Sequence, residues 1–220
     1  MRISIVSLKA GGSDEIWVGF ELAEGDNICR ESFLISTLAY TELGLLKGES
    51  DQEVYSAVER ESNIYSAFKK GMYMLGFGAC SSNMLVSKLR AKGFSTDVSR
   101  AAVERISLKG FLDENENARR EAERCCQKLW GESRIRAKLC EGRYSHEAVE
   151  QALFFLEDSG VDFDANCKSL IDRRYLVIPT DRGEMQKLIA AVCRQGYTVS
   201  QIKSACGKLA AERKRNSIFE

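Results

Sequence analysis

The feature that most constrains the fold is a unit of apolar and turn residues that occurs three times along the chain. Its clearest copy is residues 81–110, in which two amphipathic segments flank the turn Gly93-Phe94. Leu85 and Leu89 stand four residues apart, so they share one face of a helix. Gly93 suits a left-handed helix end, and Ser95 can cap the following helix. The stretch therefore predicts a helix, a tight turn and a second helix.

The same unit recurs after 50 residues and again after a further 53. Chemical type is kept at nearly every aligned position: Leu85, Leu89, Phe94, Ser95, Ala102, Val103 and Ile106; Ile135, Leu139, Tyr144, Ser145, Ala152, Leu153 and Leu156; Leu188, Val192, Tyr197, Thr198, Ala205, Cys206 and Leu209. Two positions depart from the pattern. Arg143 of the second copy aligns with Gly93 of the first, and Gln201 of the third copy aligns with Val98 and Ala148 of the first and second. A match over the whole unit indicates an internal repeat.

We therefore predict a mainly α-helical protein. Tandem three-helix, helix-turn-helix-like repeats should form an elongated curved body, preceded by a small N-terminal antiparallel β meander. The predicted boundaries are 1–62 for the meander and linking helices, then 63–112, 113–160 and 161–220 for the three repeats, the last with a basic tail. The single proline, Pro179, fits a chain of uninterrupted helices.

The first 35 residues follow a strand pattern instead. Apolar residues alternate in three segments separated by Gly-containing turns, which predicts a three-stranded meander packed against a helix. A short helix is expected at 36–43 and a linker at 47–49. A longer helix should start at Ser50, with Glu53 completing a capping box. The pattern leaves open whether that helix continues through Ser62-Asn63.

Acidic residues mark the later helix starts. Asp113 and Asp162 should open the first helices of the second and third repeats, where a negative charge complements the helix dipole. Asp181 should start a helix after the break at Pro179. The C-terminal residues 212–220 are expected to fray.

The charge and cysteine content narrow the function classes. The 32 basic and 32 acidic side chains cancel, which argues against non-specific nucleic-acid binding as the main function. Residues 1–8 lack the long apolar region of a signal peptide, and no stretch is apolar enough for a membrane span. We expect a cytoplasmic protein without membrane association, whose cysteines act as small reduced hydrophobes within helices: Cys80, Cys125, Cys140, Cys193 and Cys206.

No catalytic or metal-binding pattern is evident. His146 is the only histidine, and we interpret it as an exposed first-turn residue rather than a catalytic base. The cysteines form no C-x-x-C pair. Asp162-Phe163-Asp164 lacks the glycine and glutamate of a calcium loop, and the glycines of 71–78 lack the lysine of a nucleotide loop. We therefore predict a protein that is not an enzyme and needs no cofactor or metal.

Basic side chains remain as the candidate functional residues. We predict that the first two repeats present a basic face to an anionic partner, with these residues in contact: Arg90, Lys92, Lys109, Arg119, Arg120, Arg134, Lys138 and Arg143. Arg134 and Lys138 are expected to face solvent. The alternative is a solvated surface with intrahelical pairs to Glu104, Glu121 and Glu123.

Three segments carry a family resemblance. KLRAKGFS at 88–95, GFLDENENARR at 110–120 and WGESRIRAKL at 130–139 resemble RecX, the regulator of the bacterial recombinase RecA. The resemblance covers roughly residues 64–212, and the N-terminal segment resembles the extension of RecX proteins from Firmicutes. It implies three tandem three-helix units.

The resemblance also implies a function. Such a protein would lodge in the groove of the RecA–DNA filament, act as a monomer, and restrain ATP hydrolysis, filament growth and strand exchange in homologous recombination and DNA repair. Single- or double-stranded DNA would be at most a weak partner. The alternative is a helix-turn-helix-like DNA-binding module that acts independently of RecA.

Overall fold

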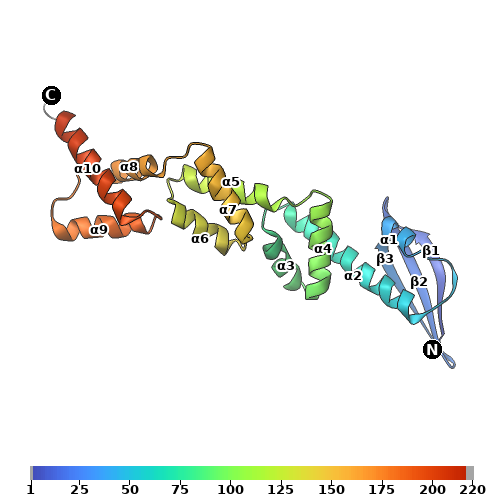
Figure 1. Ribbon diagram of the computed structural model, residues 1–220. Helices are drawn as coiled ribbons and strands as arrows, with labels where there is room; N and C mark the ends of the chain where they lie inside the picture. The colour runs from blue at the N-terminus through green and yellow to red at the C-terminus, as the bar shows by residue number, and fades with distance from the viewer. Residues whose placement is uncertain (1, 217–220) are drawn as a thin grey trace. The chain divides into compact units, whose positions relative to one another are not determined.

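Figure 1 shows the computed structural model of the chain, which describes residues 2–216. These residues form ten helices and four strands, so the protein is mainly α-helical with an N-terminal antiparallel sheet, as predicted. The chain divides into two compact units. The first comprises the chain through Ala79 together with Leu85–Leu112, and the second comprises Cys80–Met84 and the residues from Asp113 onward.

The sheet of the first unit contains the predicted meander and one additional strand. The meander consists of β1 (Arg2–Ala10), β2 (Glu15–Glu24) and β3 (Asn27–Ser36), and the strand order is β3-β2-β1-β4. The extra strand, β4 (Gly48–Ser50), pairs antiparallel with β1, so the predicted linker at 47–49 is wrong. Three residues are too few to show an alternating pattern, yet they provide hydrogen-bond partners for the otherwise open edge of β1.

Helices cover the apolar face of this sheet. The short helix α1 (Thr37–Glu42) follows β3, and the N-terminal half of α2 (Gln52–Leu75) packs against β3. The Tyr55 ring of α2 makes edge contacts with Phe20 and Phe33, at centroid distances of 5.1 and 5.5 Å. A sheet this small is marginal alone, and α2 adds the buried Val58 to its core.

The start of α2 differs from the prediction. Asp51 caps the helix by accepting a 2.8 Å hydrogen bond from the Val54 amide, whereas Ser50 is the last residue of β4. The helix then continues without a break through Ser62-Asn63 to Leu75, which resolves the alternative that the sequence leaves open.

The first repeat uses the C-terminal half of α2 together with α3 (Ser82–Arg90) and α4 (Thr96–Leu108). Gly71 allows close packing, because a Cβ atom there would lie 2.6 Å from Cδ1 of Ile106. The Arg105 guanidinium of α4 makes two hydrogen bonds to the Glu61 carboxylate of α2, one of them 3.1 Å long. The predicted cap Ser95 accepts from the Val98 amide over 3.3 Å.

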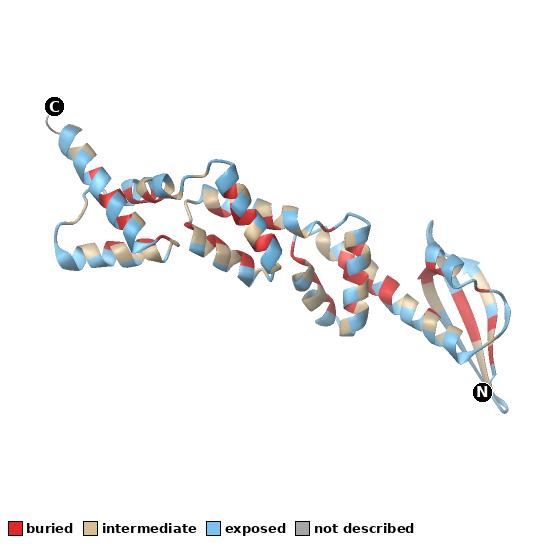
Figure 2. Ribbon diagram, in the orientation of Figure 1, coloured by how far each residue is buried: buried red, intermediate tan, exposed pale blue. Residues whose placement is uncertain are grey.

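The second unit contains two further repeats of the same design. One consists of α5 (Glu114–Gln127), α6 (Glu132–Glu141) and α7 (His146–Asp158), and the other of α8 (Phe163–Arg174), α9 (Arg182–Cys193) and α10 (Val199–Asn216). Buried residues line the inner faces of these helices (Figure 2). The aligned positions are buried in all three repeats: Leu85, Leu89, Ala102 and Ile106; Ile135, Leu139, Ala152 and Leu156; Leu188, Val192, Ala205 and Leu209.

The two departures from the repeat have structural explanations. Arg143 adopts φ +58°, close to the left-handed conformation of Gly93 and Gly196 at the aligned positions, so the turn is kept at some backbone cost. Gln201 forms a reciprocal capping box with Thr198. The side-chain carbonyl of Gln201 accepts from the backbone amide of Thr198 over 3.0 Å, and the backbone amide of Gln201 donates to the Thr198 hydroxyl over 3.2 Å.

The C-terminal helix is better anchored than predicted. Arg213 donates to Asp172 and to the carbonyl of Leu176, both over 2.6 Å, so the prediction that the chain frays from residue 212 is wrong at this residue. Residues 217–220 lie outside the described part.

The prediction that the cysteines act as small buried hydrophobes in helices holds for Cys125 and Cys206, whereas Cys140 is exposed on α6. In the part of the chain that the structure describes, no helix has the length and apolar content to cross a membrane.

Candidate functional site

The eight predicted contact residues divide between the two units. Arg90, Lys92 and Lys109 belong to the first unit, and the other five to the second. Arg90 is exposed at the end of α3. Lys92 lies exposed in the following turn, beside Lys69 and Lys70 of α2. Lys109 caps α4, with Nζ 5.7 Å from the centre of the Phe68 ring.

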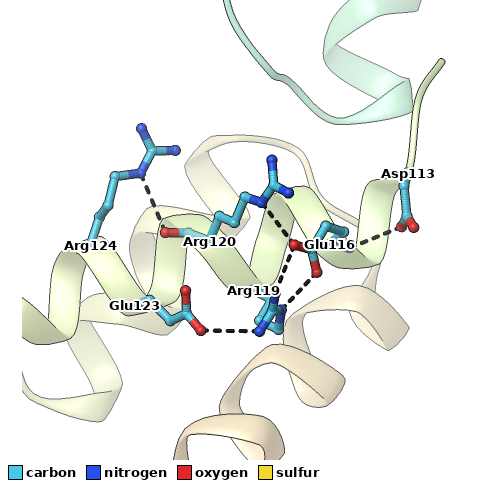
Figure 3. Close-up of polar contacts among 6 residues, drawn as sticks. All are labelled: Asp113, Glu116, Arg119, Arg120, Glu123 and Arg124. Atoms are coloured by element: carbon cyan, nitrogen blue, oxygen red, sulfur yellow. Dashed lines mark hydrogen bonds and ion pairs between the residues drawn. The ribbon is translucent and has the colours of Figure 1, made fainter.

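Two arginines of α5, Arg119 and Arg120, form a network that is anchored by one carboxylate (Figure 3). Glu116 accepts from the Nε atoms of both Arg119 and Arg120, each over 2.7 Å. The α5 cap, Asp113, accepts from the Glu116 amide over 2.9 Å and so fixes the first turn. These two guanidinium groups lower the pKa of Glu116 to about 2, with the Arg119 bond as the larger cause.

Arg119 and Arg120 differ in what they offer to a partner. Arg119 is held between Glu116 and Glu123, with its guanidinium carbon 4.6 Å from the centre of the Phe155 ring of α7. Arg120 has 65% of its side chain exposed. The alternative prediction was a solvated surface with intrahelical ion pairs. Two of those pairs are present, because Arg119 pairs with Glu123 and Arg124 pairs with Glu121. The main acceptor, Glu116, was not predicted.

Arg134 was predicted to face solvent, but it is only partly exposed and its guanidinium is held by other residues. Its guanidinium carbon lies 3.7 Å from the centre of the Trp130 ring, and its Nη1 donates to the side-chain carbonyl of Gln195 in the next repeat. Helical periodicity could not reveal this contact, because the partner lies 61 residues along the chain. Lys138 is 42% exposed and pairs with Glu141 over 2.9 Å. Arg143 is exposed in the turn before α7.

The second unit contains a recurrent junction that the sequence pattern did not predict. The amide of Gly131 donates to the Gln195 carbonyl over 2.8 Å, and the hydroxyl of Ser133 donates to the Gly196 carbonyl over 2.9 Å. The aligned positions of the preceding repeat make the equivalent bonds: Ser81 donates to the Gly142 carbonyl over 2.6 Å, and Asn83 to the Arg143 carbonyl over 3.3 Å. All of these contacts lie within the second unit. The sequence signal for this junction is that the aligned positions 81, 83, 131 and 133 all carry small or polar residues.

Other titratable groups of residues 2–216 are the remaining candidates for catalysis or metal binding. His146 is the exposed first residue of α7, as predicted, with Nδ1 3.5 Å from Glu150. Within residues 2–216, no group of three or more His, Cys, Asp or Glu side chains is placed to hold a metal ion. Burial raises the pKa of Cys167 to about 12, which keeps it a thiol and therefore a poor nucleophile.

Comparisons with known proteins agree on one group. Two relatives named "Regulatory protein RecX", from Xanthomonas axonopodis pv. citri and Xanthomonas citri, are each 30% identical over 119 residues, which covers 54% of this chain and 72% of the relative. No family model matches the chain.

Two solved structures have a similar fold. A structure titled as the regulatory protein RecX matches with a TM-score of 0.67 and 17% identity, covering 92% of this chain and 99% of its own. RecX from Lactobacillus salivarius matches with a TM-score of 0.58 and 14% identity, covering 68% and 97%.

Proposed function

Because this chain belongs to the RecX family of regulators of the recombinase RecA, we propose that it binds the groove of the RecA–DNA filament as a monomer. Bound there, it restrains filament growth, ATP hydrolysis and strand exchange. RecX proteins are regulators rather than enzymes, so this effect comes from binding alone. Several weak contacts along tandem repeats act together, because one bound contact raises the effective concentration of the next.

The observation that best supports this proposal is the arginine network of α5. Arg120 is largely exposed, and its 2.7 Å bond to Glu116 holds the guanidinium in one orientation before any partner arrives. A pre-oriented arginine loses less conformational entropy on binding a carboxylate or phosphate. Of the predicted residues, we assign Arg120 and Arg143 of the second unit and Arg90, Lys92 and Lys109 of the first to partner contact. Arg119 takes a smaller part, because Glu116 and Glu123 already hold its guanidinium.

Arg134 and Lys138 take a smaller part in this proposal. The Arg134 guanidinium is occupied by Trp130 and Gln195, and Lys138 is paired with Glu141. A partner could recruit either side chain only by breaking the existing contact, which reduces its net contribution.

The test is a titration of this protein into RecA that hydrolyses ATP on single-stranded DNA. We expect suppression well below the concentration that saturates the DNA. Arg120→Glu should raise the half-maximal concentration about tenfold, which corresponds to ~1.4 kcal/mol. This variant should fold normally, because Arg119 still holds Glu116.

The matched control is Arg182→Glu, which reverses an exposed charge at the start of α9 in the same unit. It should leave the titration unchanged. Unaltered ATPase and strand exchange at stoichiometric doses of the unmodified protein would refute the proposal. Suppression only when the DNA is saturated would favour the helix-turn-helix-like DNA-binding module that acts without RecA.

A further inference from the structure

We propose that the first unit binds single-stranded nucleic acid, independently of RecA, in an open pocket between α2 and the turn after α3. This pocket has a volume of about 570 Å³ and is lined by Leu34, Ser66, Lys69, Lys70, Tyr73, Lys92 and Phe94. We call it the lysine–aromatic pocket. It lies entirely within the first unit.

Two of its three lysines are available for phosphate groups. Lys69 is neutralised by Glu15, with Nζ 2.7 Å from the carboxylate. Neither Lys70 nor Lys92 forms an ion pair with a carboxylate of residues 2–216. The pocket therefore carries a local positive charge although the whole chain is neutral, and a backbone phosphate is a suitable counter-charge.

The exposed ring of Tyr73 lines this pocket, and the exposed ring of Phe77 packs against it. Tyr73 and Phe77 are 62% and 77% exposed, and their rings meet edge to face at a centroid distance of 4.9 Å. Nζ of Lys70 lies 5.0 Å from the centre of the Tyr73 ring. Rings beside lysines form a surface on which unpaired bases stack while their phosphates meet the positive charge. An acidic peptide would use the lysines but leave the rings exposed to water.

The other repeats show why this pocket is open. Phe94 aligns with Tyr197 of the third repeat, which is buried and donates a 3.0 Å hydrogen bond to the Leu129 carbonyl of the second. No three-helix repeat precedes Phe94 in the described residues 2–62. The space that the second repeat fills at Tyr197 is therefore free for a ligand at Phe94.

The test uses the full-length protein without RecA and a fluorescent oligothymidylate, with anisotropy measured over a range of salt concentrations. Lys70→Gln/Lys92→Gln should reduce the slope of log affinity against log salt by about 1.4, since each phosphate contact on a single strand contributes about 0.7. Tyr73→Ala/Phe77→Ala should weaken binding about tenfold with the slope retained, because stacking is lost.

The control Lys203→Gln/Lys208→Gln removes two exposed lysines from α10 of the second unit and should keep the affinity and slope of the unmodified protein. Both rings are exposed, so their replacement should leave circular dichroism unchanged. Absence of binding at low salt, or an equal loss in the control, would overturn the proposal. Competition by poly-glutamate that depends on Lys70 and Lys92 but not on Tyr73 would instead assign the pocket to acidic peptides. None of these results depends on whether the protein regulates RecA.

Discussion

Gly131 lies so close to Gly196 that a Cβ atom on Gly131 would stand 2.3 Å from the Gly196 carbonyl oxygen. The two glycines belong to different repeats of the second unit, and the hydrogen bonds of Gly131 and Ser133 surround this contact. The junction between the repeats is therefore a backbone-to-backbone contact that tolerates little extra volume. A stack of repeats depends on such junctions as well as on the core of each repeat.

Gly131→Ala should destabilise the second unit by roughly 1–3 kcal/mol, because the added methyl group must displace backbone. Urea unfolding measures the change. The matched control is Gly207→Ala in α10, where a Cβ would meet nothing within 4 Å; it should stabilise by about 0.5–1 kcal/mol through helix propensity. Equal stability of the two variants would show that the junction yields without cost.

Arg134→Ala should destabilise the second unit by about 1–2 kcal/mol, because it removes the Trp130 stacking contact and the hydrogen bond to Gln195. Lys138→Ala, one turn further along α6, should change stability by less than about 0.5 kcal/mol, since it removes only an exposed pair with Glu141. Thermal unfolding of both variants tests this difference. A stable Arg134→Ala variant would mean that the junction does not need the guanidinium.

The ion pairs of Glu116 with Arg119 and Arg120 in α5 should make the free energy of unfolding depend on pH. The pKa of Glu116 is lowered in the folded protein, so the folded state binds this proton less tightly than the unfolded state. The stabilisation is therefore complete above about pH 4.5 and declines as the pH falls toward about 2.

Glu116→Gln should thus be less stable than the unmodified protein at neutral pH, with the difference shrinking in acid. Urea unfolding at neutral pH and at about pH 3 measures the stability difference between the two proteins under both conditions. Glu104→Gln, which alters an exposed carboxylate of α4, serves as the control. A difference that stays constant with pH would contradict the network as its source.

Arg213→Ala should loosen the end of α10, because it removes the hydrogen bonds to Asp172 and to the carbonyls of Tyr175 and Leu176. Hydrogen exchange should become faster in the last turns of α10 and at residues 175–178, while the amides of α5 remain unchanged. Unchanged protection of α10 would mean that apolar packing alone anchors this helix.

Much of the fold could be predicted because it depends on local chemistry. Apolar residues at helical spacing mark the buried faces of all three repeats, and Asp113, Ser145 and Asp181 cap helices as their side chains suggest. The lone His146 likewise lies exposed at a helix start. Each of these features depends on residues a few positions apart.

The candidate site was less predictable because exposure of a basic residue depends on distant partners. Periodicity assigned Arg134 and Lys138 to one solvent-facing surface, but Gln195 and Trp130 occupy the guanidinium of Arg134. Likewise, the lysines and aromatic rings of the lysine–aromatic pocket come from α2 and from the turn after α3, and only folding brings them together.

The helical repeat and its turns could be predicted from the chain alone, since the spacing and type of neighbouring residues control these features directly. Three contacts became visible only in the folded chain: β4 pairs with β1, Gly131 meets Gly196, and Gln195 holds the guanidinium of Arg134. The physical reason is that these contacts join residues about 45 to 65 positions apart. Hydrogen bonds and close packing at that separation leave no periodic pattern in the chain.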